Sequence, residues 1–179
     1  MNRAAALVAV LAVAGTLAGC GAAPEPMSTS MAPVTADASA PAPPVLGTAA
    51  DDLPAARVVL IRPDGGEVPV VVRVAATPMA RTRGLMGVED LPAGAGMLFQ
   101  YPEVAAHGGF WMRGTLVPLD IAFLAVGEVV AVATMTPCAA DPCPITTPGR
   151  PYDAALEVPA GWLAAEGIGP GTRLVTPGG

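Results

Sequence analysis

Two charged residues, Arg113 and Asp120, stand inside the apolar segment 110–123, which also contains Trp111. A charge in such surroundings is either buried with a partner or exposed in a site. One interpretation is an internal ion pair between Arg113 and Asp120 that fixes a loop. The other is a cleft in which the arginine binds an anionic or hydroxylated ligand while Trp111 stacks beside it. The sequence leaves both interpretations open.

Cys138 and Cys143 lie close together in a proline-rich segment. In an exported protein, two neighbouring cysteines are expected to be oxidised, and closing so small a loop stabilises a fold by about 2 kcal/mol. We therefore predict a structural disulfide. A redox or metal-binding thiol pair is the alternative, although the spacing is neither C-x-x-C nor part of a four-cysteine set.

The methionines of the chain suggest a further hypothesis, which is copper binding. Thioether sulfur together with cysteine and histidine suits Cu(I). Methionine is also an ordinary filler of irregular cores, and the spacing here is not tight, so packing is the simpler interpretation. The methionines in question are Met79, Met86, Met97, Met112 and Met135.

The residue types that this chain lacks exclude several kinds of catalytic site. It contains no lysine, its only histidine is His107, and its three serines all precede residue 40. Serine triads, Schiff-base lysines and sites with several histidine ligands are therefore excluded from the region that looks folded. An enzyme acting on an envelope carbohydrate would depend on carboxylates, with Asp120 and Glu157 as candidates and His107 as a proton donor. We expect no catalytic residue, metal or cofactor, and favour a protein that is not an enzyme.

Five short motifs in order resemble the bacterial and archaeal domain of unknown function 192. They are Arg81-Thr-Arg-Gly-Leu-Met86, Gly96-Met-Leu-Phe99, Phe110-Trp-Met112, Pro118-Leu-Asp-Ile121 and Leu156-Glu-Val158. The resemblance extends over about residues 70–175 and implies a small, mostly antiparallel β fold in a commonly exported protein. It also implies a ligand-binding region formed by Arg81, Arg83, Trp111, Met112, Arg113, Thr115 and Asp120. The chain departs from the family pattern at Arg113-Gly114-Thr115, Gly87 and Ala154.

Short β-branched and aromatic runs predict the elements that position these residues. Strands are expected at 57–61, 70–74, 97–99, 110–112, 121–126, 129–133, 156–158 and 172–175. The Pro63-Asp-Gly-Gly66 segment is typical of a hairpin turn, and Gly127-Glu128 of a two-residue, glycine-first turn. Helices are expected at 77–85, where Thr77 is an N-cap before Pro78, and at 159–166. The chain is thus predicted to be mainly β, a compact, mostly antiparallel small barrel or sandwich with one or two short helices.

The amino-terminal residues are typical of a bacterial lipoprotein signal. Arg3 precedes an apolar run, and Leu17-Ala-Gly-Cys20 has the form of a lipobox. We expect residues 1–19 to be the signal peptide, with lipid attached to Cys20 and anchoring the chain in a membrane. Residues 20–54 are rich in alanine, proline, serine and threonine, which predicts a disordered tether. One β-rich domain is expected at 55–179.

The net charge of −6 argues against nucleic acid as a partner, because phosphate binding requires clustered cations. The sequence therefore predicts an exported lipoprotein that faces the periplasm or cell wall and contacts the membrane through its lipid. Its function is predicted to be that of a binding or accessory module for a cell-wall or small-molecule ligand. A carboxylate enzyme and a copper-handling protein are the alternatives.

Overall fold

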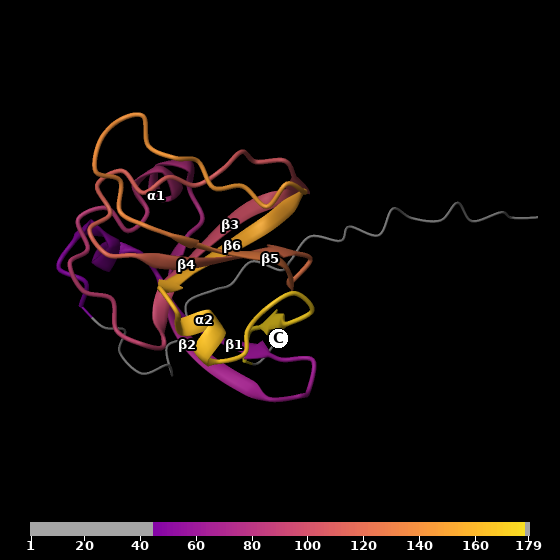
Figure 1. Ribbon diagram of the computed structural model, residues 1–179. Coiled ribbons are helices and arrows are strands. Elements are labelled where there is room, and N and C mark those ends of the chain that lie inside the picture. Colours follow the sequence, from indigo (N-terminus) through magenta and orange to yellow (C-terminus); the bar gives the residue numbers. More distant parts are fainter. Residues whose placement is uncertain (1–44, 178–179) are drawn as a thin grey trace, which may run out of the picture.

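Seven strands close into a barrel in the computed structural model, which describes residues 45–177 (Figure 1). The order around the barrel is β1-β2-β3-β6-β4-β5-β7. All neighbouring strands are antiparallel except β2 and β3, which are parallel. The strands are β1 (Ala55–Ile61), β2 (Glu67–Ala75), β3 (Ala95–Ala105), β4 (Leu119–Ala125), β5 (Glu128–Met135), β6 (Tyr152–Pro159) and β7 (Arg173–Val175). The predicted fold class, a small and mostly antiparallel β barrel, is confirmed.

Two short α-helices accompany the barrel, as predicted, and Figure 1 shows them on opposite sides of it. The helix α1 (Pro78–Arg83) lies in the crossover that the parallel pair β2–β3 requires. The helix α2 (Trp162–Ala165) follows β6 directly. No helix in residues 45–177 has both the length and the apolar character needed to cross a membrane.

Side chains of the strands alternate between two cores, because successive residues of a strand point to opposite faces. One cluster takes apolar residues from all seven strands, among them Val58, Leu98 and Leu156, and fills the barrel. The second cluster, which we call the outer layer, packs residues of β3, β4 and β6 such as Phe99 and Ile121 under the long loops and α1. The candidate site lies in this outer layer.

The strand expected at 110–112 is not formed. Phe110 makes an isolated bridge with Thr146, and the residues after it belong to a loop. Phe110 and Met112 are nevertheless buried in the outer layer, whereas Trp111 between them is exposed. Short apolar runs do not distinguish a strand from a buried loop.

The turn between β4 and β5 also differs from the glycine-first type expected. Its two central residues are Val126 and Gly127, with φ of 52° and 75°, and the flanking Ala125 and Glu128 are paired. A positive φ is unusual for a β-branched residue. The amide of Val126 donates to the Asp153 carboxylate at 3.1 Å, a contact from a strand far along the chain that supports this conformation.

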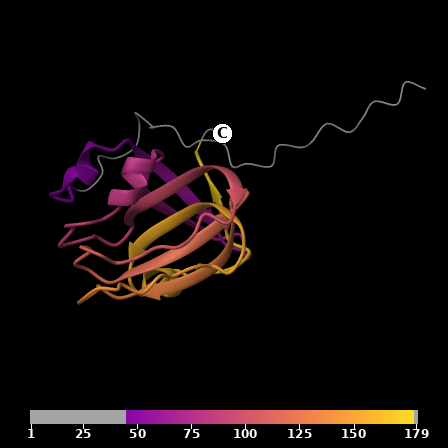
Figure 2. The same ribbon diagram turned by 90° about the horizontal axis from the view of Figure 1, so that it is seen from above.

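The folded part begins before residue 55. A short 3-10 helix, η1 (Ala49–Asp52), lies on the same side of the barrel as α1 (Figure 2), and Leu46 and Ala50 are buried. The Asp51 carboxylate accepts from the amides of Leu46 and Gly47 and pairs with Arg73 of β2 at 3.2 Å. These contacts, led by the Leu46 amide, lower the pKa of Asp51. The end of the segment predicted to be a tether is thus held on the barrel, whereas Cys20 and residues 1–44 lie outside the described residues.

Candidate functional site

A pocket of about 310 Å³ opens on the outer face of the barrel, and we call it the α1–β3 pocket. One wall is formed by residues 78–86, which include α1. Phe99 and Tyr101 of β3 line it from the barrel side, together with Glu157 of β6. The loop that carries residues 109–115 forms the opposite wall. Segments far apart in the sequence therefore meet at one site.

Five of the seven residues predicted for a ligand site line this pocket: Arg81, Arg83, Trp111, Arg113 and Thr115. Met112 does not line it, because its side chain points into the outer layer and is only 4% exposed. Asp120 does not line it either.

The register of the strands explains where Asp120 lies. Asp120 of β4 is paired with Val158 of β6, and Ile121 is paired with Glu157. Because side chains alternate, Asp120 points to the barrel interior, like Val158, whereas Glu157 points to the outer layer. The Asp120 carboxylate accepts from the Thr134 hydroxyl at 2.7 Å and from the Leu163 amide at 3.1 Å. It therefore caps the start of α2, whose own N-cap residue, Gly161, has no side chain for that purpose.

Neither hypothesis that paired Asp120 with a second residue matches this geometry. Arg113 forms its ion pair with Asp141, so the internal Arg113–Asp120 pair is not present. Asp120 and Glu157 face opposite sides of the sheet, so they do not flank a common substrate as a two-carboxylate hydrolase requires. His107 lines no part of the pocket; it stacks on Tyr101 with ring centroids 4.1 Å apart, and its Nε2 lies 2.7 Å from the Glu103 carbonyl oxygen.

Glu157 is the buried acid of the pocket, with only 4% of its surface exposed. Burial raises its pKa from the ordinary 4.5 to about 8, because a charged carboxylate is poorly solvated there. Among the described residues, the Glu157 side chain makes no hydrogen bond or ion pair. The group is therefore neutral at pH 7 and has an unused donor and acceptor.

Local structure places this carboxyl at the base of the pocket. A Cβ at Gly96 of β3 would lie 2.3 Å from the Glu157 backbone oxygen, so only glycine permits β3 and β6 to come this close. At the end of α1, Gly84 has a φ of 52°, and a Cβ there would contact the Phe99 ring at 3.4 Å. The two glycines thus allow the close packing of α1, β3 and β6 around the site.

The three arginines of the pocket differ in their partners. Arg81 donates from Nη1 to the carbonyls of Ala76 and Gln100 at 2.6 and 2.7 Å, and its guanidinium lies 4.6 Å from the Tyr101 ring centroid. It therefore holds α1 against β3. Arg113 pairs with Asp141 and lies 5.3 Å from the Trp111 ring centroid. Arg83, at the exposed end of α1, makes no hydrogen bond or ion pair with any described residue.

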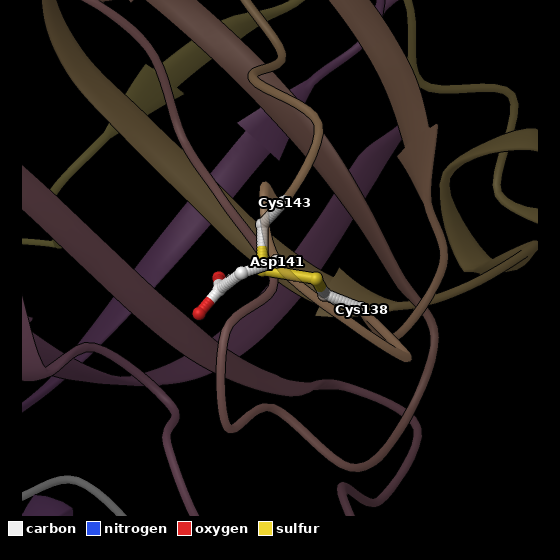
Figure 3. A group of neighbouring side chains, drawn as sticks. All are labelled: Cys138, Asp141 and Cys143. Atoms are coloured by element: carbon white, nitrogen blue, oxygen red, sulfur yellow. A yellow bond between two sulfur atoms is a disulfide. The ribbon is translucent and has the colours of Figure 1, made fainter.

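The predicted disulfide between Cys138 and Cys143 is present and closes the loop that carries Asp141. Figure 3 shows Asp141 beside the two cysteines, and its Oδ1 lies 3.6 Å from the Cys143 sulfur. These three side chains lie close enough together to suggest a metal site. However, disulfide sulfurs are not thiolate ligands, and the carboxylate is already paired with Arg113. The loop therefore supports the rim of the pocket through Asp141 and Arg113.

Sequence reasoning named Glu157 only as a catalytic candidate and did not place Phe99 or Tyr101 in the site. The signal for Glu157 was present, because a lone acid in the run Leu156-Glu-Val158 of a buried strand requires an explanation. No local signal indicated Tyr101. Its place in the pocket depends on β3 extending to Ala105, well beyond the short strand expected.

Comparisons with known proteins identify relatives of the fold. Residues 59–176 match the family model DUF192, described as uncharacterized ACR. A crystal structure from Sinorhizobium meliloti 1021, described as a "putative transcription regulator", is 29% identical with a TM-score of 0.63, covering 69% of this chain and 95% of that one. A protein of unknown function from Novosphingobium aromaticivorans DSM 12444 is 24% identical with a TM-score of 0.60, covering 84% and 98%. The search of curated proteins returned no match.

Proposed function

The chain belongs to the DUF192 family, and from that premise we propose that it is a lipid-anchored binding module of the cell envelope whose small ligand occupies the α1–β3 pocket. The observation that carries the proposal is the unpartnered, buried carboxyl of Glu157 at the base of a pocket lined by Arg83 and Trp111. The Glu157 carboxyl is reached from the pocket and has no partner among the described residues, so it is available to a ligand.

The size and lining of the pocket support a small-molecule ligand. Its volume lies at the lower end of the range for such sites, and its wall combines aromatic rings with a few convergent polar groups. Among the described residues, Glu157 is the only acid that lines the pocket, and it is neutral at pH 7, whereas three arginines line it. A protein with net charge −6 thus presents a locally positive pocket, which favours a ligand with an anionic group.

The other two functions weighed from the sequence have less support. A two-carboxylate hydrolase lacks its second acid, since Glu157 is the sole carboxyl among the described residues that line the pocket. Copper binding is less favoured because both cysteines of the folded part form the disulfide and are not free thiolate ligands. In addition, Met97, Met112 and Met135 are buried in the outer layer as packing residues.

A thermal-shift screen tests the binding function. The full chain, kept in detergent because of its apolar amino-terminal run, is heated with sugars, cell-wall fragments, organic acids and amino acids. A ligand at about a hundred times its Kd adds about 2.7 kcal/mol and raises Tm by several degrees. We expect the shift to fall to about half in Arg83→Ala and to persist in full in Arg57→Ala, an exposed arginine of β1 outside the pocket. A screen without any shift contradicts the proposed function.

Metabolic labelling with an alkyne fatty acid tests the anchor separately. We expect label on the wild-type chain and none on Cys20→Ala, with the labelled protein in the membrane fraction. Equal labelling of both chains, or none of either, contradicts lipid attachment at Cys20.

A further inference from the structure

Two side chains of the α1–β3 pocket have an ionisable group with no partner among the described residues, Arg83 and Glu157. The remaining guanidiniums are already engaged: Arg81 with backbone carbonyls and Arg113 with Asp141. The unused groups therefore comprise one cation and one acid. They form no ion pair with each other.

Their positions place them at different depths of the same pocket. Arg83 is exposed at the last residue of α1, whereas Glu157 is only 4% exposed on β6. A guanidinium at the mouth and a carboxyl at the base leave the space of the pocket between them. A ligand that fills this space meets both groups, one at each end.

The base of the pocket suits a cationic group. Phe99 and Phe110 pack edge to face with ring centroids 5.0 Å apart, and both line the pocket with Tyr101. Aromatic faces attract an ammonium group, and the adjacent carboxyl ionises to pair with it. The mouth suits an anionic group, because Arg83 is exposed there and has no partner among the described residues.

We propose that the α1–β3 pocket binds a small zwitterion of the amino-acid type, with the ligand's anionic group on Arg83 and its ammonium group on Glu157. This inference rests on the proposed binding function and adds the chemical class of the ligand. The ligand's anionic group then pairs with the Arg83 guanidinium, and its ammonium group pairs with the Glu157 carboxylate. A simple anion would leave the buried carboxyl without a charged partner, and a simple amine would leave Arg83 without one.

Matched ligands of graded length test the proposal by calorimetry on the full chain in detergent at pH 7. The zwitterions are glycine, γ-aminobutyrate and ε-aminocaproate. Each is compared with the carboxylic acid that lacks its amine and with the amine that lacks its carboxylate. We expect at least one zwitterion to bind about tenfold or more tightly than both of its matched compounds. The length of the best ligand reports the separation of the two protein groups.

Proton release gives a readout that ordinary pocket binding does not. Glu157 holds its proton at pH 7 because its pKa is about 8, and pairing with an ammonium group ionises it. Binding enthalpies in buffers of different ionisation enthalpy should therefore show release of close to one proton per zwitterion. The other ionisable groups that line the pocket are Arg81, Arg83, Arg113 and Tyr101. Burial raises the pKa of Tyr101, so its hydroxyl does not supply the proton.

Two variants assign the ends of the ligand. Glu157→Gln keeps the shape of the neutral side chain and should abolish the proton release while lowering zwitterion affinity to that of the matched acid. Arg83→Gln should lower the affinity about tenfold with the proton release per bound ligand unchanged. Arg57→Gln, outside the pocket, should behave as wild type.

The outcomes separate this inference from the proposed function. If the matched acid binds as tightly as the zwitterion without proton release, the pocket is an anion site; the zwitterion inference fails and the binding function stands. If the matched amine binds as tightly, the inference fails in the same way. If no zwitterion binds while the thermal-shift screen finds another ligand, only the inference is overturned. If that screen finds nothing, the binding function fails as well.

Discussion

Asp120 and Glu157 lie on neighbouring strands of the barrel and are buried to nearly the same degree, with 3% and 4% exposed surface. Their surroundings are nonetheless different. Asp120 accepts hydrogen bonds from Thr134 and from the first turn of α2, inside the barrel end. Glu157 faces the outer layer, has no partner among the described residues, and has a raised pKa. The contrast shows that burial of an acid alone does not indicate a binding site. A site is indicated when the buried acid has no protein partner and also faces a cavity.

The same contrast recurs at the rim of the pocket. Arg113 is paired with Asp141, which the Cys138–Cys143 loop holds in place, whereas Arg83 is unpaired. We therefore expect substitutions of the partnered groups to affect stability and those of the unpartnered groups to affect pH dependence and binding.

The largest expected effect concerns Glu157 and pH. Its pKa is raised from 4.5 to about 8 in the folded state, so between these values the folded chain keeps a proton that the unfolded chain has lost. The free energy of unfolding is then highest below pH 4.5. It falls by about 1.4 kcal/mol per pH unit between pH 4.5 and about pH 8. In Glu157→Gln this contribution disappears. We expect the wild type to lose several kcal/mol relative to the variant over that range in urea denaturation.

A matched control distinguishes this effect from the loss of any negative charge. Glu67→Gln removes an exposed acid of β2 and should leave the slope of stability against pH as in wild type. Parallel profiles of wild type and Glu157→Gln would contradict the assignment of a neutral, unpaired Glu157.

The next effect is the loss of stability in Asp120→Ala. The substitution removes the acceptor of the exposed Thr134 hydroxyl and of the buried Leu163 amide, and leaving a buried donor unsatisfied is costly. We expect a decrease of about 3 kcal/mol in the free energy of unfolding, measured from the urea midpoint at constant m-value. Ligand binding by the folded fraction should be unchanged. A decrease below about 1 kcal/mol would mean that Asp120 is not the cap of α2.

An intermediate effect is expected for the rim disulfide. Replacing Cys138 and Cys143 together by alanine should lower the free energy of unfolding by about 2 kcal/mol, as expected for a small closed loop. Since the loop supports only the partnered Arg113, ligand binding by the folded fraction should change little. Chemical reduction of the wild type serves as an independent route to the same state. Unchanged stability after either treatment would show that the loop holds its shape without the covalent link.

The smallest effect is expected for the exposed ion pair of Arg113 and Asp141, whose side chains are 52% and 59% exposed. A double-mutant cycle with both alanine variants should give a coupling energy of about 0.5 kcal/mol. Arg83→Ala should leave stability unchanged and weaken binding, because that guanidinium has no partner to lose. A stability loss in Arg83→Ala comparable to that in Asp120→Ala would remove the distinction between partnered and unpartnered groups.

Much of the local structure follows from the sequence because it depends on neighbours along the chain. The β1–β2 hairpin, the Thr77 cap of α1 and the disulfide all join residues a few positions apart. The errors arose where distant contacts decide. Val126 keeps a positive φ with support from Asp153, and η1 is held on the barrel by Arg73. The five predicted residues that line the pocket had been grouped by the family resemblance, not by spacing along the chain.

The sequence by itself determined the family, the β class of the fold, the disulfide and a set of candidate site residues that did not include Phe99 or Tyr101. The tertiary structure decided which of them share the pocket. Asp120 and Glu157 look alike in sequence, as lone acids in apolar strands, and only the register of β4 against β6 turns one inward and the other toward the pocket. Side chains of a strand alternate with a period of two, so one position in register separates a structural cap from a candidate binding group.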